Sequence, residues 1–310
     1  MILTVTPNAS IDKTYVIDGF AVDRMHRPSM ATSVPGGKGI NVLRVFQELG
    51  GSGLATGFVG GRVGGAIEEG LASEEIPHDL VHVSGESRLC IKIVDPHNGT
   101  QTEVNEVGPS VSAEDVDALI AKIGGLLDDI DYIVLSGNLP PGAPVSLYGD
   151  ITQMAKSRGV KTVLDASEEN LRQSIKAGPY IVKPNTAELS QLANRELMTI
   201  EEIVSAAKSL KQYGVDIAAV TMGRSGAIVT DGVRAWQAVP PRIQFASAVG
   251  SGDSFVAAFL YALASGAGLP EALVLATAAG AANATTYSAG FCSKSSIMET
   301  KQGVVLTELG

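Results

Sequence analysis

The chain has 310 residues, enough for one large α/β domain or two smaller ones. Apolar residues make up 45% and charged residues 18%, a composition typical of a folded protein and not of a disordered chain. The formal net charge is −10 and no basic cluster occurs, which argues against binding to nucleic acid. No apolar run has the length of a membrane span. With no signal peptide and only Cys90 and Cys292, we expect reduced thiols and a cytoplasmic location.

The first third of the chain combines short strands with a glycine-rich turn. Ile2–Thr6 is predicted to be a buried strand that ends at Pro7-Asn8, and Asp12 follows in a polar turn. The next expected elements are a strand at 14–17, a helix that Gly36–Gly39 opens and Gly50-Gly51 ends, a strand at 54–59 and a helix at 64–72.

The turn Gly36-Gly37-Lys38-Gly39 differs from a P-loop, because it lacks the upstream glycine and the Ser or Thr after the lysine. Its backbone still allows close approach of a ligand, which Lys38 or Asn41 could bind through hydrogen bonds. The alternative is a plain glycine turn before a helix.

Residues 78–106 contain strands with no helix between them. Val81–Val83, Leu89–Val94 and Thr102–Asn105 alternate or are rich in β-formers. We interpret them as part of a small sheet that forms a lid; the alternative is an antiparallel extension of the core sheet. One domain over 1–310 is expected, with lid strands inserted from about 12–35 and 80–107.

Two arginines are candidate anion ligands. Arg88 lies in a lid strand beside apolar residues, and Arg27 precedes Pro28 in an early loop. A pair of arginines can hold a phosphate through several charge-assisted hydrogen bonds, although either alone is more often a solvated surface residue.

From Ala113 onward, strands alternate regularly with helices. The predicted helices are 113–127, 145–157 and 200–213, and the predicted strands are 132–135, 162–165, 180–182, 218–221, 227–230 and 234–237. This order predicts a parallel sheet with helices on both faces. Most candidate polar residues follow a strand, where ligands bind in open α/β sheets.

Two motifs near these strand ends carry chemistry. Gly250-Ser251-Gly252-Asp253 enters an apolar helix, whose free N–H groups and dipole favour an anion, and Asp253 is either an N-cap or a general base. Asn185 and Glu188 are three residues apart, so they either position Mg²⁺ through water or cap a helix.

Four motifs in this order and spacing resemble the ribokinase-like (PfkB) carbohydrate kinases over essentially the whole chain: Gly36–Asn41, Ser136–Gly142, Lys183–Leu189 and Gly250–Ser254. Within that family, Gly85–Cys90 and the GSGD spelling look most like the branch of 1-phosphofructokinase and tagatose-6-phosphate kinase. The resemblance implies a three-layer α/β/α core with a mainly parallel sheet and a small β-sheet lid.

The resemblance also implies the activity: ATP- and Mg²⁺-dependent phosphorylation of a ketohexose monophosphate, tagatose 6-phosphate or fructose 1-phosphate, to a 1,6-bisphosphate. A 6-phosphofructokinase, a kinase of a free sugar or nucleoside, and a non-catalytic sugar-phosphate sensor are the alternatives. An exposed lid sheet needs covering, so a homodimer formed through the lid is a further expectation.

The resemblance implies a role for each motif residue. Asp253 would be the base, with the amides of Gly250, Ser251 and Gly252 as the anion hole. Sugar hydroxyls would be held by Asp12, Gly37 and Asn41, and the sugar phosphate by Arg27, Lys38 and Arg88. Lys183, Asn185 and Glu188 would serve the nucleotide phosphates and, through water, Mg²⁺. Thr221, Gly223 and Gly226 would line the nucleotide cleft, with Asn283 near the adenine.

Two departures from the family pattern affect these roles. Pro7-Asn8 inverts the usual Asn-Pro and could shift the loop before Asp12. Asn138, a candidate substrate contact, stands where serine is commoner.

Overall fold

The computed structural model describes residues 1–309. Its core is a 10-stranded sheet in the order β14-β13-β12-β11-β10-β9-β8-β1-β4-β5. The strands are β1 (Ile2–Thr6), β4 (Gly53–Gly60), β5 (Val81–Val83), β8 (Tyr132–Ser136), β9 (Lys161–Asp165), β10 (Ile181–Val182), β11 (Ile217–Thr221), β12 (Ala227–Thr230), β13 (Ala235–Val239) and β14 (Val305–Leu309). Neighbours from β5 to β11 pair in parallel, whereas β12, β13 and β14 add antiparallel.

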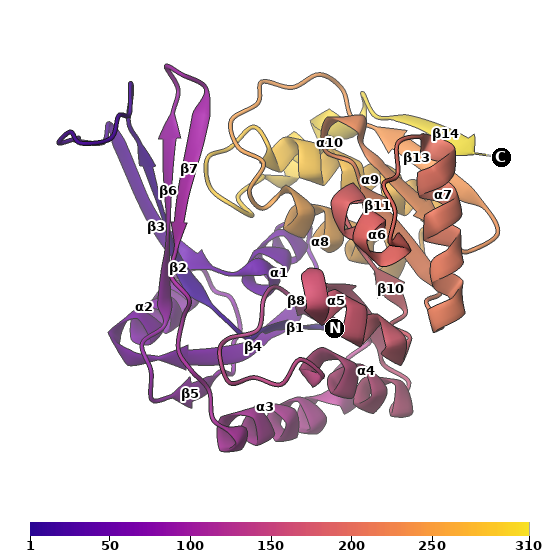
Figure 1. Cartoon of the computed structure of the whole chain (residues 1–310), viewed down its shortest axis with the longest axis horizontal. Helices are drawn as coiled ribbons and strands as arrows, with labels where there is room; N and C mark the ends of the chain where they lie inside the picture. Colours follow the sequence, from indigo (N-terminus) through magenta and orange to yellow (C-terminus); the bar gives the residue numbers. More distant parts are fainter. Residues whose placement is uncertain (310) are drawn as a thin grey trace.

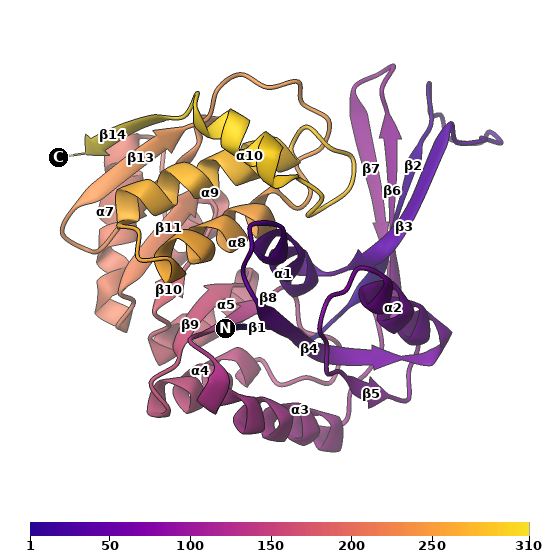
Figure 2. The same cartoon turned by 180° about the vertical axis from the view of Figure 1, so that it is seen from behind.

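Helices cover both faces of this sheet (Figures 1 and 2). One face carries α1 (Lys38–Glu48), α2 (Gly61–Ser73), α8 (Ser251–Ala264), α9 (Leu269–Asn283) and α10 (Lys294–Lys301). The other carries α3 (Ala113–Leu126), α4 (Leu147–Ser157), α5 (Glu168–Ser174), α6 (Thr186–Ala193) and α7 (Ile200–Ser209). Short 3₁₀ turns occupy Leu127–Asp129, Ile175–Ala177, Leu210–Tyr213 and Gly223–Ser225.

Alternation along the central strands explains the three layers. In β8, Tyr132 and Val134 pack into the core under α1 and α8, while Ile133 and Leu135 pack into the core under α3 and α4. Successive side chains of a strand point to opposite faces, so an all-apolar strand requires cover on both sides. The predicted three-layer α/β/α architecture is confirmed.

A separate four-stranded sheet in the order β3-β2-β6-β7 projects from the core (Figure 1). Its strands are β2 (Ser10–Val16), β3 (Met30–Gly36), β6 (Arg88–Asp95) and β7 (Thr100–Asn105). Because it does not continue the core sheet, it matches the expected lid and not the alternative extension. We call these four strands the lid.

Three local predictions were wrong. Val81–Val83 is β5 and pairs in parallel with β4 in the core sheet, so the second lid segment begins at Arg88. The alternation of three residues cannot tell a sheet edge from a lid strand. Asp12 lies within β2 and not in a turn, and the helix expected to reach residue 213 ends at Ser209 before a 3₁₀ turn.

No helix in residues 1–309 combines the length and the apolar character needed to cross a lipid bilayer.

Candidate active site

A cavity of about 510 Å³ lies between the lid and the carboxyl edge of the core sheet. It brings together residues that are far apart in the chain and that the sequence singles out. Of the predicted site residues, those lining it are Asp12, Gly37, Lys38, Asn41, Arg88, Asn138, Glu188, Gly250, Gly252 and Asp253. Thr6 and Ser136 at the ends of β1 and β8 also line it, as expected for a site at the ends of parallel strands.

Asp253 lies in the first turn of α8 and is only 5% exposed. Its Oδ2 accepts a hydrogen bond of 2.9 Å from Nδ2 of Asn41 on α1. Burial raises the pKa of Asp253 to about 6, although Lys38 and the Asn41 hydrogen bond oppose that rise. The side chain does not cap its own helix, because Gly250 is the N-cap residue and no side-chain cap bond forms. A buried carboxylate with a pKa near neutrality is suited to accept a proton.

The loop before Asp253 is shaped by Gly250, which has a φ of 83°. A Cβ at Gly250 would lie 2.6 Å from Cα of Ala289, so a side chain is excluded by contact as well as by conformation. Within residues 1–309, the amides of Gly252 and Asp253 have no hydrogen-bond acceptor. The predicted anion hole needs one correction, because the Ser251 amide already donates to the carbonyl of Ala248 at 3.1 Å.

Two lysines meet a buried acid, Asp165, beneath the cavity; of these three residues, Lys38 lines the cavity itself. Nζ of Lys38 lies 3.1 Å and 3.2 Å from the two carboxylate oxygens of Asp165, and Nζ of Lys183 lies 3.1 Å from Oδ1. Burial raises the pKa of Asp165, but Lys183 and Lys38 outweigh it and hold that pKa below its usual value. The triad places two fixed cations beside Asp253 and the free amides. Lys183 lies close to the free amides at the start of α8, because a Cβ at Gly252 would be 3.7 Å from Nζ of Lys183.

Asp165 was missed by the sequence analysis, although a signal existed. It is the last residue of β9, and an acid that ends a buried parallel strand faces the ligand edge of the sheet.

The lid contributes the opposite wall of the cavity. Asp12 accepts a hydrogen bond of 2.6 Å from Oγ of Ser10, and its burial raises its pKa against the opposing effects of Ser10, Arg88 and Lys92. Arg88 donates from Nε to the carbonyl of Asn8 at 3.0 Å, so the inverted Pro7-Asn8 places a carbonyl that orients this arginine. The lid therefore offers an acid and cations on one face.

Lys92 is a second cation that the sequence analysis missed. It is 7% exposed, lines the cavity, and donates from Nζ to the carbonyl of Tyr287 at 2.7 Å. The sequence contained a signal for Lys92: it follows Arg88 by an even number of residues in a strand, so both side chains lie on the same face of β6.

Asn138 lines the cavity beside Ser167, whose Oγ donates to Oδ1 of Asn138 at 3.0 Å. The asparagine that replaces a commoner serine keeps a polar group at the predicted substrate position.

Asn185 and Glu188 form the helix cap that was the alternative interpretation. The Asn185 amide donates to Oε2 of Glu188 at 2.8 Å, and the Glu188 amide donates to Oδ1 of Asn185 at 2.9 Å. Glu188 nevertheless lines the cavity. In residues 1–309 no cluster of three or more His, Cys, Asp or Glu side chains could hold a metal alone. A hydrated Mg²⁺ shared with nucleotide phosphates does not need such a cluster.

The remaining predicted nucleotide residues lie outside the cavity. Thr221 is the last residue of β11 and forms an isolated parallel β-bridge with Asn185. Gly223 is the first residue of the 3₁₀ turn that follows. Gly226 has a structural reason to be glycine, since a Cβ there would overlap the carbonyl of Ala238.

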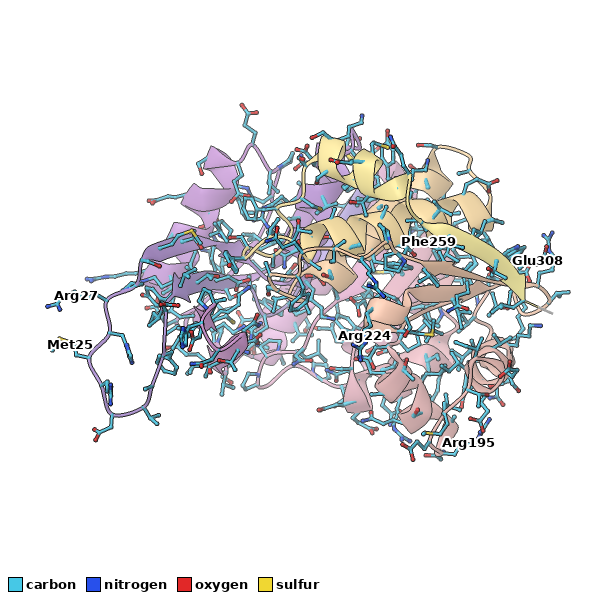
Figure 3. The ribbon with its side chains drawn as sticks, turned by 90° about the horizontal axis from the view of Figure 1, so that it is seen from above. Met25, Arg27, Arg195, Arg224, Phe259 and Glu308 are labelled. Atoms are coloured by element: carbon cyan, nitrogen blue, oxygen red, sulfur yellow. The ribbon has the colours of Figure 1, made fainter. Side chains whose placement is uncertain are left out.

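Two predicted site residues lie away from the cavity in this chain. Arg27 is exposed on the loop between β2 and β3, and Figure 3 shows it with Met25 on a segment that projects away from the body of the molecule. Sequence position could not show which way this loop points. Asn283 is fully buried: Nδ2 donates to the carbonyl of Val249 at 2.8 Å, and Oδ1 accepts from the Gly290 amide at 2.8 Å. It joins two loops of this chain and has no surface for an adenine.

Comparison with known proteins agrees with this geometry. The model of the pfkB family carbohydrate kinases matches residues 5–296. The chain belongs to this family. The predicted resemblance is therefore confirmed.

Individual relatives cover nearly the whole chain. A tagatose-6-phosphate kinase of Staphylococcus epidermidis is 35% identical over 293 residues, which are 94% of this chain and 94% of that protein. A structure described as a "possible 1-phosphofructokinase" of Thermotoga maritima is 28% identical, with a TM-score of 0.92 and full coverage of both chains. Phosphofructokinase-2 of Escherichia coli is 29% identical and covers 97% of this chain and 98% of its own. Its potassium complex has a TM-score of 0.90 and its tetrameric inhibited form 0.89.

Proposed function

We propose that this chain is an ATP-dependent hexose-phosphate kinase that transfers the γ-phosphoryl group of ATP to a hydroxyl of a ketohexose monophosphate. The observation that carries the proposal is the position of Asp253. This buried carboxylate lies where the lid cavity meets free helix amides and two lysines. Phosphoryl transfer requires mainly an aligned acceptor oxygen and neutralised charge, which this arrangement supplies.

In the reaction, the acceptor hydroxyl lies in the cavity beside Asp253, which accepts its proton. The hydroxyl oxygen forms a bond to the γ-phosphorus as the bond from that phosphorus to ADP breaks. The amides of Gly252 and Asp253, with Lys38 and Lys183, stabilise the charge on the transferred group. We assign Lys38 to this task and no longer to the sugar phosphate, because Asp165 holds it at the floor of the cavity.

The acceptor is proposed to carry a phosphate because Arg88 and Lys92 lie on the cavity face of the lid. A free sugar or nucleoside would bring no anionic group for these two cations to bind. Tagatose 6-phosphate is our first candidate, since the relative named for it is 35% identical over most of both chains. Fructose 1-phosphate and fructose 6-phosphate are the alternatives to be measured beside it.

Mg²⁺ is proposed as the metal that accompanies ATP. When bound, it would neutralise phosphate charge, with Glu188 and Asn185 contacting its water shell from the start of α6. Glu188 uses Oε2 for the helix cap, and its side chain lies at the edge of the cavity.

A homodimer through the outer face of the lid is also proposed. Pairing in register places Tyr15, Ile93 and Thr102 side by side on the face opposite Asp12 and Lys92, and the alternation along β7 places Val104 away from its cavity-lining neighbours Glu103 and Asn105. Tyr15 and Ile93 are partly exposed and Val104 is 56% exposed. Apolar side chains on an open sheet face favour a partner surface.

A cytoplasmic location is proposed because the free Cys90 thiol lines the cavity and would stay reduced in that compartment.

The test is ADP release measured with tagatose 6-phosphate, fructose 6-phosphate, fructose 1-phosphate and free fructose, for the wild type and Asp253→Asn. We expect one phosphate to be clearly preferred and Asp253→Asn to lose at least about 10³-fold in kcat while still binding ATP. ADP release with free fructose above that with every phosphate would favour a free-sugar kinase. Binding without turnover would favour a sensor.

A further inference from the structure

Arg44 lies on α1 directly behind Asn41 and outside the cavity lining. We propose that it is a positioning residue, which fixes the side-chain amide of Asn41 and through it the carboxylate of Asp253. The inference rests on the proposed function, in which Asp253 is the base.

The guanidinium of Arg44 is held from four sides. Nη1 donates to Oδ1 of Asn41 at 2.9 Å, Nη2 donates to the carbonyl of Pro35 at 2.7 Å, and Nε donates to Oε2 of Glu74 at 2.6 Å. Its Cζ lies 4.5 Å from the ring centre of Phe291. The side chain is 9% exposed, so these contacts have little competition from water. Such a bonded and stacked guanidinium is a rigid reference point.

This reference decides which end of the Asn41 amide faces the base. An asparagine can present either its oxygen or its NH₂ group, whereas arginine has donors only. Arg44 therefore requires the oxygen of Asn41, which leaves the NH₂ group to donate to Asp253 at 2.9 Å. A flipped amide would place its oxygen against the carboxylate and its NH₂ group against the guanidinium. Both contacts would be repulsive.

Burial increases the consequence of this choice. Asn41 is 4% exposed and Asp253 is 5% exposed, so water cannot readily replace a lost hydrogen bond. The loop at Gly290 packs against the base of the Asn41 side chain, since a Cβ at Gly290 would lie 3.2 Å from Cβ of Asn41. The orientation of Asn41 must be supplied by protein groups.

Arg44 also connects Asn41 and Asp253 to the end of the lid strand β3, where the chain enters α1. Pro35 belongs to β3 and immediately precedes Gly36 and Gly37, which lead into α1. Arg44 therefore holds the junction between the lid and α1 through the Pro35 carbonyl, and it also contacts Asn41, which donates to Asp253.

The experiment compares Arg44→Met with Glu74→Gln as the matched control. Both remove the Arg44–Glu74 ion pair, but only Arg44→Met removes the donor to Asn41. We expect Arg44→Met to lower kcat by at least about 10-fold, with a smaller effect on KM, and Glu74→Gln to keep kcat within about two-fold. Thermal unfolding of each variant separates loss of fold from loss of positioning.

The pH dependence of kcat gives a readout that a purely structural role would not change. Charged groups that face Asp253 are Lys38 of α1, Asp165 of β9 and Lys183 after β10, and all three are retained in every variant. Losing the Asn41 donor disfavours the carboxylate, so the acid limb of Arg44→Met should move to higher pH. Arg44→Lys, which keeps charge and most of the stem, should move it in the same direction, and serves if the methionine variant does not fold.

A double-mutant cycle with Asn41→Ala completes the test. If Arg44 acts through Asn41, then Arg44→Met should add little to the loss in kcat that Asn41→Ala already causes. The inference would be overturned if the fold-losses in kcat from Arg44→Met and Asn41→Ala multiplied in the double mutant, and the acid limb of the kcat pH profile in the folded Arg44 variants matched that of the wild type. Absence of phosphoryl transfer by the wild type would instead overturn the proposed function.

Discussion

Asp253 illustrates how burial changes the chemistry of a single residue. Asp12 and Asp253 both have a pKa raised by burial, whereas Asp165, which is also buried, has a pKa held low by two lysines. In the proposed function the three acids therefore have separate roles: Asp253 accepts a proton, Asp12 binds hydroxyl groups, and Asp165 anchors the two lysines.

Replacement of Asp253 should stabilise the fold at neutral pH. Its folded-state pKa, about 6, lies above the 3.8 of an ordinary aspartate, so its contribution to stability is greatest at low pH and is lost as pH rises through 6. The shift corresponds to at most about 3 kcal/mol. Asp253→Asn should therefore raise the Tm by several degrees at pH 8, and this gain should shrink below pH 6, as scanning calorimetry at both pH values would show. A gain that is equal at pH 5 and pH 8 would contradict the assigned shift.

Arg88→Ala tests the proposal that the lid binds the phosphate of the acceptor. Loss of a charge-assisted contact to phosphate should raise the KM for the sugar phosphate by about 10- to 100-fold with a smaller change in kcat. Arg62→Ala, at an exposed position of α2 outside the cavity, is the control and should leave KM unchanged. Steady-state kinetics with the preferred phosphate would decide it; an unchanged KM in Arg88→Ala would remove Arg88 from the binding site.

Two elements begin at the site, and each has a first turn with a distinct purpose. α8 starts without a side-chain cap and leaves amides free, whereas α6 starts with a complete capping box at Asn185 and Glu188. The first arrangement suits an anion ligand, and the second makes the helix start rigid beside it.

Gly250→Ala should damage both fold and activity. Gly266 provides a matched control, because its φ of 85° resembles the 83° of Gly250 while a Cβ there would meet nothing within 4 Å. Each substitution carries the cost of a left-handed residue, about 1–2 kcal/mol, but only Gly250→Ala adds a clash with Ala289. We expect Gly250→Ala to have the lower Tm and at least about 10-fold lower kcat, and Gly266→Ala to keep its kcat. Equal kcat in both would show that the loop tolerates movement.

Glu188→Gln separates capping from metal binding. Glutamine keeps an oxygen acceptor for the Asn185 amide but loses the charge, so the Tm should change little while the Mg²⁺ concentration for half-maximal rate rises several-fold. Glu202→Gln alters an equivalent capping box at the start of α7, outside the cavity, and should leave the Mg²⁺ requirement unchanged. Titration of the rate with Mg²⁺ measures both; identical curves for Glu188→Gln and wild type would leave Glu188 with capping alone.

At the scale of the whole molecule, the lid has two unlike faces. Residues that alternate along β2, β6 and β7 place polar groups toward the cavity and apolar groups such as Ile93 and Val104 outward. A sheet with one apolar face requires cover, which the core supplies to neither Ile93 nor Val104.

Val104→Lys should weaken the proposed dimer. A charge in an apolar interface is costly to bury, so the variant should elute as a monomer where the wild type elutes as a dimer, in size-exclusion chromatography with light scattering. Val233→Lys, at a position that is 78% exposed between β12 and β13, is the control and should not change the mass. A wild-type monomer at micromolar concentration would contradict the dimer.

The sequence by itself determined the layered core and the main residues of the site. Strands such as Tyr132–Ser136 are apolar on both faces, which requires helices above and below, and polar motifs after successive strands must meet at one edge of a parallel sheet. This local logic placed most of the polar motifs at one edge of the sheet, and the resemblance to the family implied that Asp12, Asn41, Arg88 and Asp253 belong to one site.

Only the tertiary structure decided the contacts that depend on the direction of a loop or on which side chains from distant elements form hydrogen bonds. Asp165 gained its role because two lysines distant in sequence converge on it, and Asn283 lost its role because both ends of its amide hold backbone. Arg27 follows a loop whose direction no spacing encodes, and β5 joined the core because of pairing with β4. Arg44 was indistinguishable from a solvated arginine until its three acceptors were placed around it. Periodicity specifies which face a residue occupies, but hydrogen-bond partners across elements are set by packing.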